Sequence, residues 1–137
     1  MGRTFSNVVD FQADDGLENE GIDLAFGHGR YITVARSGGG NRRYRVALTE
    51  AYKPHKAAME RNTMDDETAT KMLREVFAKT VVLDWRGWKD DAGEEIPYSS
   101  DACMDLFEAA PEIFRIVQDE SEKFANFAKQ EVEDSGN

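Results

Sequence analysis

The chain has 137 residues and a formal net charge of −10, with 40% hydrophobic and 32% charged side chains. This length predicts one domain that can bury a core without a disulfide or a metal, and the hydrophobic fraction argues against a chain disordered throughout. No run approaches the roughly 18 apolar residues of a membrane-spanning helix, and no basic and then apolar leader opens the chain. We therefore expect neither membrane insertion nor secretion. A single cysteine, Cys103, fits a reducing compartment.

Charge is unevenly distributed along the chain. Residues 36–61 hold seven basic and two acidic side chains, whereas residues 62–137 hold eight basic and 19 acidic ones. An acidic chain of this kind is a poor general binder of nucleic acid, so we expect no nucleic-acid partner. The basic segment either faces an anionic partner or neutralises the chain's own acidic surface, and the second alternative is the more ordinary one.

The first predicted element follows an N-terminal arm, residues 1–20, in which apolar residues show no sustained period. Apolar residues then alternate with others over residues 22–26 and 31–34, on either side of Gly27-His28-Gly29. Two alternating runs around a short glycine-containing loop predict a β-hairpin. Because a lone hairpin is marginally stable, we expect its apolar face to pack against helices.

A first helix is predicted after the glycine-rich segment 37–40. Asn41 is a candidate N-cap, and the residues that follow place an apolar face at helical spacing. Pro54 lacks the amide proton that a helix interior needs, so this helix should end near Tyr52.

Three more helices follow in the sequence. The second begins within residues 63–66, and its apolar stripe runs on into Val81 and Leu83. The third is capped by one of the serines at 99–100, and Pro111 is well placed as the first residue of the fourth.

These elements predict a small α+β fold, mostly α, with an N-terminal β-hairpin packed against about four short helices. Residues 1–20 are expected to form a flexible arm, residues 21–130 a single α+β domain and residues 131–137 a frayed acidic tail.

Catalytic and metal-binding patterns are weak in this sequence. Cys103 shares an apolar helix face with Leu106 and Phe107, which predicts a buried structural cysteine, and His28 is expected as a solvated residue of the hairpin loop. Zinc-ligand spacings such as Cys-x-x-Cys and His-x-x-x-His do not occur, and residues 90–95 lack the spacing of an EF-hand loop. We expect a solvated turn at 90–95, no enzyme activity, no cofactor and no metal.

The segment Ser37-Gly38-Gly39-Gly40-Asn41 lacks the Lys-Ser/Thr pair of a phosphate loop. Glycine-rich backbone at a helix start can still hold an anion, although a flexible connection is the favoured interpretation. Arg42, Arg43 and Arg45 flank this point and are candidate contacts for an acidic partner segment.

Large aromatic side chains are the other candidate contacts. Trp85, Trp88 and Tyr98 are candidate interface anchors, because such residues are enriched at binding hot spots. Ordinary core packing is the competing interpretation for each of them.

Several motifs occur in an order that is typical of one family of phage proteins. A Gly-Ile-Asp-Leu strand and a Tyr-Ile-Thr-Val-Ala-Arg strand precede the Gly-Gly-Gly-Asn-Arg-Arg-Tyr turn. The most specific element is a tryptophan followed by the Asp-x-x-Gly-x-x-Ile-Pro-Tyr-Ser block at 90–99 and by Pro-Glu-Ile-Phe at 111–114. Over residues 21–127, the chain resembles the tail assembly chaperones of long-tailed bacteriophages.

The resemblance implies a non-enzymatic late protein of the host cytoplasm that binds the tail tape measure protein during tail morphogenesis. It also implies a longer product made by ribosomal frameshifting, which recruits tail tube subunits, and absence of the chaperone from the mature virion. Two alternatives stay open: a structural tail or head–tail protein retained in the virion, and a phage-encoded inhibitor of a host protein. Whether the chain forms a homo-oligomer also stays open.

Overall fold

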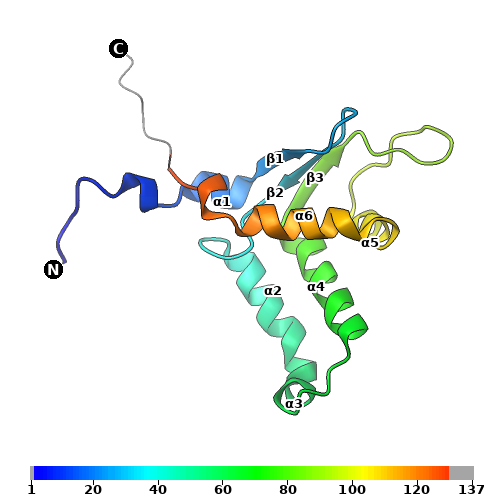
Figure 1. The fold of residues 1–137 in the computed structure, drawn as a ribbon, viewed down its shortest axis with the longest axis horizontal. Coiled ribbons are helices and arrows are strands. Elements are labelled where there is room, and N and C mark those ends of the chain that lie inside the picture. The colour runs from blue at the N-terminus through cyan, green and yellow to red at the C-terminus, as the bar shows by residue number, and fades with distance from the viewer. Residues whose placement is uncertain (1, 130–137) are drawn as a thin grey trace.

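The computed structural model describes residues 2–129, so the acidic tail expected at 131–137 lies outside the described residues. Figure 1 shows an α+β fold that is mostly α, as the sequence predicts. The helices are α1 (Asp15–Glu20), α2 (Arg42–Tyr52), α3 (Lys56–Glu60), α4 (Asp66–Thr80), α5 (Ser100–Ala109) and α6 (Pro111–Glu122). The strands are β1 (Ile22–Ala25), β2 (Tyr31–Val34) and β3 (Val82–Arg86), and short 3₁₀ turns lie at η1 (Val9–Phe11), η2 (Lys53–His55) and η3 (Phe124–Asn126).

The three strands form an antiparallel sheet in the order β1-β2-β3. The predicted hairpin is confirmed, with Ile22 paired with Val34 and Leu24 paired with Ile32. On its other edge, β2 pairs Ile32 with Trp85 of β3. Ile32 and Val34 are fully buried, so the apolar face of β2 lies in the core.

The expectation that the apolar stripe of the second helix continues through Val81 and Leu83 is wrong. The chain leaves the helix after Thr80 and forms strand β3. Helix α4 ends at Thr80, and the backbone N–H of Ala35 donates to the carbonyl oxygen of Val81 at 2.7 Å. Residues 81–85 are rich in β-branched and aromatic side chains, which suit a pleated strand. Because the free edge of β2 can satisfy their backbone groups, pairing with β2 outweighs continuation of the helix.

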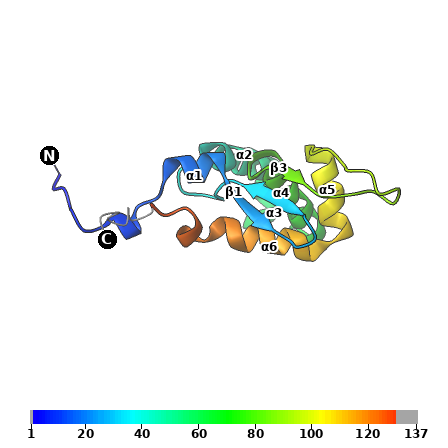
Figure 2. The same ribbon diagram turned by 90° about the horizontal axis from the view of Figure 1, so that it is seen from above.

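Helix α6 lies along the sheet, whereas α2, α3 and α4 project away from it. In Figure 1, α6 crosses in front of the strands, and Figure 2 shows it running along one side of them. Where α4, α5 and α6 meet, the ring centroid of Phe114 lies 4.8 Å from that of Phe107 and 5.4 Å from that of Phe77. Fully burying an aromatic or aliphatic side chain contributes about 1.5–3 kcal/mol, so this aromatic cluster is a main source of stability.

Residues 1–20 do not all form a loose arm, because residues 15–20 fold into helix α1. Asp14 caps it, since its Oδ1 accepts a hydrogen bond from Leu17 N at 3.2 Å. The N–H of Asp14 also donates to the carbonyl oxygen of Phe127 at 2.7 Å. A helix of six residues has too little periodicity to be seen in the sequence and depends on such contacts for its stability. Residues 2–12 extend away from the body (Figure 1).

Candidate partner-binding surface

Helices α2, α3 and α4 project from the sheet and form what we call the helical arm, residues 42–80 (Figure 1). Helix α2 runs outward and α4 returns, with η2 and α3 at the tip. The end of α2 at Tyr52 agrees with the break predicted from Pro54, which lies in η2. Asp65 caps the returning helix by accepting a hydrogen bond from Thr68 N at 2.7 Å.

Asn41 joins the two helices at the base of the arm. As predicted, it caps α2, with its Oδ1 accepting from Tyr44 N at 3.4 Å. Its Nδ2 donates to the carbonyl oxygens of Arg36 at 2.9 Å and Thr80 at 3.0 Å. Because Asn41 is fully buried, these bonds satisfy polar groups that water cannot reach.

An open groove runs along the seam between α2 and α4, and we call it the seam groove. Two adjoining depressions of about 370 and 430 Å³ form it and share Ala51, Met72 and Glu75. The floor combines two small residues of α2, Ala47 and Ala51, with Met72 and Val76 of α4. The rim carries both charges and a histidine: Glu50, His55, Lys71, Glu75 and Lys79. The one sign of the groove in the sequence is the pair Ala47 and Ala51, four residues apart on the predicted helix.

The three predicted arginines lie in the first turns of α2. Arg42, Arg43 and Arg45 are all exposed, and Arg45 donates from Nη1 to the carbonyl oxygen of Gly39. The first turn of α2 contains no acidic residue. Because a helix N-terminus carries partial positive charge, a cation there is unfavourable by roughly 0.3–1 kcal/mol. Helix stability therefore does not explain the placement of these arginines.

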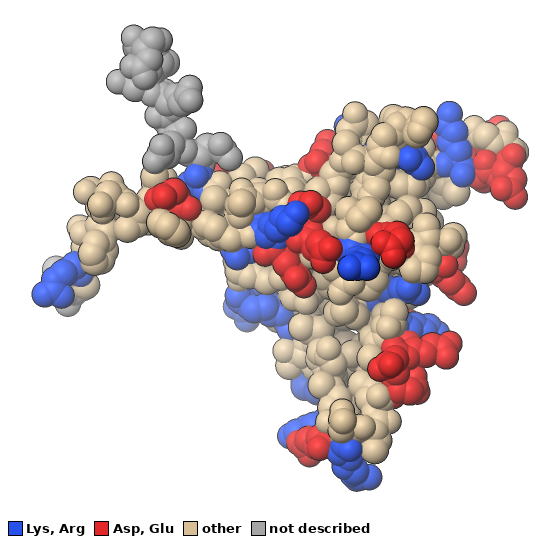
Figure 3. All heavy atoms as spheres, viewed as in Figure 1, with Lys and Arg blue, Asp and Glu red and all other residues tan. Residues whose placement is uncertain are grey.

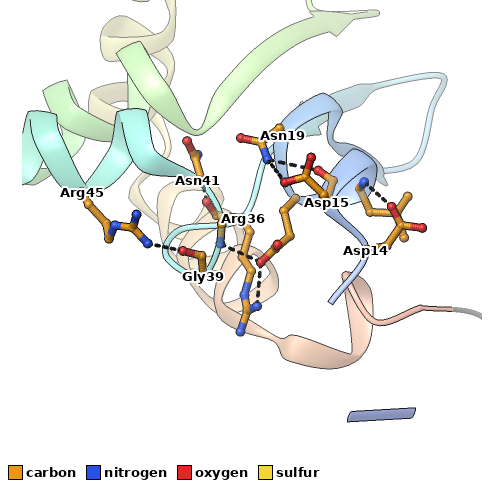
Figure 4. Close-up of polar contacts among 10 residues, drawn as sticks. Asp14, Asp15, Asn19, Arg36, Gly39, Asn41 and Arg45 are labelled. Carbon is orange, nitrogen blue, oxygen red and sulfur yellow. Dashed lines mark hydrogen bonds and ion pairs between the residues drawn. The ribbon is translucent and has the colours of Figure 1, made fainter. Parts of the chain in front are cut away.

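The glycine-rich loop before α2 already encloses an anion of the chain itself, the carboxylate of Glu18. Glu18 is only 4% exposed and accepts hydrogen bonds from Arg36 Nη1 at 2.8 Å and from Gly40 N at 2.9 Å. Figure 4 shows this loop with Arg36, Gly39 and Arg45. A Cβ on Gly40 would lie 2.5 Å from Glu18 Oε1, so any larger residue here would displace the Glu18 carboxylate from its hydrogen bonds. The loop is thus held by Glu18, which the sequence reading missed.

Trp85 and Trp88, which the sequence offers as candidate interface anchors, lie in the core. Each is 7% exposed. The indole N–H of Trp85 donates to the carbonyl oxygen of Ile96 at 2.8 Å, and the indole N–H of Trp88 donates to the backbone carbonyl oxygen of Tyr31 at 3.1 Å. This placement supports the competing interpretation and leaves little of either ring for a partner.

Tyr98 is half-buried and lies against α4 and β3. Its hydroxyl is 2.7 Å from the carbonyl oxygen of Ala78 and 3.0 Å from that of Val82. Burial raises the pKa of Tyr98. The phenol therefore acts as a neutral hydrogen-bond donor that joins the start of α5 to the end of α4. The three aromatics and the three arginines do not form one surface.

The predicted structural roles of the polar and sulfur-containing residues are confirmed. Cys103 is fully buried, and burial raises the pKa of its thiol to about 12, so it is protonated at neutral pH. His28 is exposed in the hairpin turn with a φ of 55°. Residues 90–95 form an exposed turn in which Asp90 Oδ1 accepts from Ala92 N at 2.9 Å.

Residues 2–129 contain no group of three or more His, Cys, Asp or Glu side chains placed to hold a metal ion. Within the same residues, each helix is too short or too polar to cross a membrane.

Comparison with known protein families indicates where the chain comes from. The model of a family described as YdaY prophage protein matches residues 39–137, well over half of the chain. The match begins inside the glycine-rich loop and includes the helical arm, β3, α5 and α6, while β1 and β2 precede it. No curated protein and no solved structure matched the chain. A prophage family supports a phage origin, and the chain belongs to the YdaY prophage protein family.

Proposed function

We propose that this protein is a phage tail assembly chaperone that binds the tape measure protein before tail tube subunits assemble around it. The seam groove is the observation that carries the proposal, because it is an open groove between two helices with a small apolar floor and a charged rim. The resemblance over residues 21–127 supports the same role, and membership of a prophage family supports a phage origin.

The dimensions and lining of the seam groove suit a client helix. Its α4 wall extends from Thr68 to Lys79, which corresponds to roughly 17 Å of helix or about three turns. The small side chains of Ala47 and Ala51 allow a client helix to approach α2 closely. An amphipathic client would place its apolar face on Ala47 and Ala51 and its polar face toward the charged rim, while Met72 and Val76, only 8% and 4% exposed, close the floor beneath.

In this role the protein binds the tape measure protein and later releases it, and it makes or breaks no covalent bond. The client contacts lie in the seam groove of the helical arm, which includes none of Arg42, Arg43 and Arg45, and not on the buried rings of Trp85 and Trp88. The protein acts in the host cytoplasm and leaves before the virion matures, and a longer frameshift product brings the tail tube subunits. Mass spectrometry of purified virions tests this point, since a structural tail protein would be present there in many copies.

Co-elution tests the proposal. The chain and the tape measure protein of the same phage are mixed and run together on a size-exclusion column. We expect one shared peak with the wild type and two separate peaks with Ala51→Glu, which places a charge on the groove floor. Ala109→Glu, at an exposed position in the last turn of α5, is the matched control and should co-elute.

Two outcomes contradict the proposal. Separate peaks with the wild type argue against a tape measure chaperone. Equal co-elution of both variants argues against the seam groove as the site. If Ala51→Glu loses its helical circular dichroism, Glu75→Lys on the exposed rim replaces it, because this position is not part of the core.

A further inference from the structure

A second surface lies on the side of α2 that faces away from α4. We call it the basic stripe, and it combines basic residues with exposed apolar ones: Arg42, Arg45, Val46, Thr49, Lys53, Lys56 and Met59. Positions 42, 45, 46, 49 and 53 recur at helical spacing and so share one face. In Figure 3, Lys and Arg gather along the α2 side and at the tip of the helical arm, whereas Asp and Glu lie mostly on the α4 side.

The stripe is continuous and hollowed. One depression of about 270 Å³ is lined at the base of α2 by Arg42, Arg45 and Val46. A second, of about 310 Å³, is lined toward the tip by Tyr52, Lys56 and Met59, and both include Thr49. Together they extend along all of α2, a length of roughly 17 Å that matches about three turns of a partner helix.

Apolar side chains are exposed within this stripe. Val46 is 50% exposed and Met59 is 43% exposed. Neither takes part in the core, and each lies in a depression lined by two basic residues and one glutamate, Glu50 beside Val46 and Glu60 beside Met59. An apolar centre with a polar rim is the arrangement found where proteins bind one another.

The charges of the stripe have few partners within the molecule. Among the described residues, Arg42 and Lys56 take part in no ion pair, whereas Lys53 pairs with Glu50 at 2.8 Å. The arginines also lie at the positive end of α2, where they do not stabilise the helix. A partner that supplies carboxylates would compensate both unfavourable features.

We propose that the basic stripe docks an acidic amphipathic helix of a partner protein, with apolar side chains on Val46 and Met59 and carboxylates on Arg42 and Lys56. The seam groove lies on another flank of α2, and Glu50 borders both surfaces, so this inference goes beyond the proposed chaperone function. The rest of the molecule is strongly acidic, so it repels such a helix elsewhere and favours this one docking site. The exposed apolar residues favour a helix over a nucleic acid, whose backbone offers them no contact.

The test uses a synthetic peptide probe of about 18 residues, long enough to form a helix, with leucines at i, i+4 and i+7 and glutamates on the other face. Its binding to the full chain is followed by fluorescence anisotropy at about 50 and about 300 mM salt, where screening differs strongly. We expect saturable binding that weakens with salt. A peptide with lysines in place of the glutamates should bind at least about tenfold more weakly.

Two double variants with the same change in net charge locate the site. Arg42→Glu with Lys56→Glu should weaken peptide binding by about tenfold or more, because both docking cations are reversed. The control variant, Lys89→Glu with Arg115→Glu, changes two exposed positions outside the stripe, one after β3 and one on α6. It should bind the peptide as the wild type does. Reversal at Arg42 places an acidic residue in the first turn of α2, which favours the helix, so lost binding will not reflect unfolding.

Four outcomes overturn the inference. Equal binding by both double variants would show that net charge, not the stripe, controls the affinity. Absence of peptide binding would exclude the proposed partner chemistry. Tighter binding of a single-stranded oligonucleotide that competes with the peptide would assign the stripe to nucleic acid. Sedimentation that shows self-association of the wild type, lost only in the stripe variant, would assign it to a second copy.

Discussion

Asn41 Nδ2 donates a hydrogen bond to the carbonyl oxygen of Thr80 across 3.0 Å, although 39 positions separate the two residues in the sequence. The same side chain caps α2, so one buried amide fixes the start of the outgoing helix and the end of the returning one. The geometry of the helical arm, and therefore of the seam groove, depends on this contact.

Replacing Asn41 should destabilise the protein strongly. Asn41→Ala removes the cap and leaves buried carbonyl oxygens of Arg36 and Thr80 without a donor, at a total cost of about 2–4 kcal/mol. Asn41→Asp keeps a cap acceptor but loses the donor. Urea unfolding should place Asn41→Asp at least as far below the wild type as Asn41→Ala, because its second oxygen would face both carbonyl oxygens without water. Asn19→Ala, which loses only exposed hydrogen bonds, should stay close to the wild type.

The close approach of Glu18 to Gly40 predicts coupling between these two residues. Gly40→Ala should destabilise the native state, since the new methyl group would meet the Glu18 carboxylate. In a Glu18→Ala background, the same substitution should cost less because the obstructing carboxylate is gone. A double-mutant cycle from urea unfolding should give an interaction energy of about 0.5–3 kcal/mol, and strictly additive effects would contradict the described loop.

The positions of the tryptophans predict a stability effect and a spectroscopic one. Trp85→Ala should cost roughly 3–5 kcal/mol, as expected for a large aromatic side chain lost from a core. Native tryptophan emission should be blue-shifted and move to longer wavelength on unfolding. Val46→Ala, at a half-exposed position, should change stability by less than about 0.5 kcal/mol. If Trp85→Ala leaves the unfolding midpoint unchanged, the ring belongs to an exposed surface.

Stability should fall in acid as capping and paired carboxylates gain protons. Hydrogen bonds from Thr68 lower the pKa of Asp65 below its ordinary 3.8, and a hydrogen bond from Thr33, with Arg86 nearby, lowers that of Asp23. Because these folded-state pKa values are lowered, the stabilisation is complete above the unfolded pKa and is lost as the pH falls through the folded one. Asp65→Asn keeps a capping acceptor without this titration, so its stability should depend less on pH between about 5 and 2.

Local rules account for the elements that could be predicted from the sequence. The cap at Asn41, the break at Pro54 and the start of α6 at Pro111 each follow from one residue's backbone chemistry. Alternation likewise predicted the β1–β2 hairpin. These features need no knowledge of what lies elsewhere in the fold.

Contacts between distant segments account for what was missed. Residues 82–86 form a strand only because the edge of β2 is available to them, and α1 is held through Asp14 and the buried Glu18. The seam groove arises from two helices that lie side by side. Core and surface stayed open for Trp85, because its strand and the pairing of that strand with β2 were not predicted.

Site-specific photocrosslinking tests the central claim most directly. A photoreactive amino acid at position 51 lies in the seam groove, and one at position 109 lies on exposed α5 as the control. In infected cells during tail assembly, position 51 should crosslink to the tape measure protein and position 109 should not. Equal crosslinking from both positions, or crosslinks from position 51 only to some other protein, would contradict the claim that this groove holds the tape measure protein.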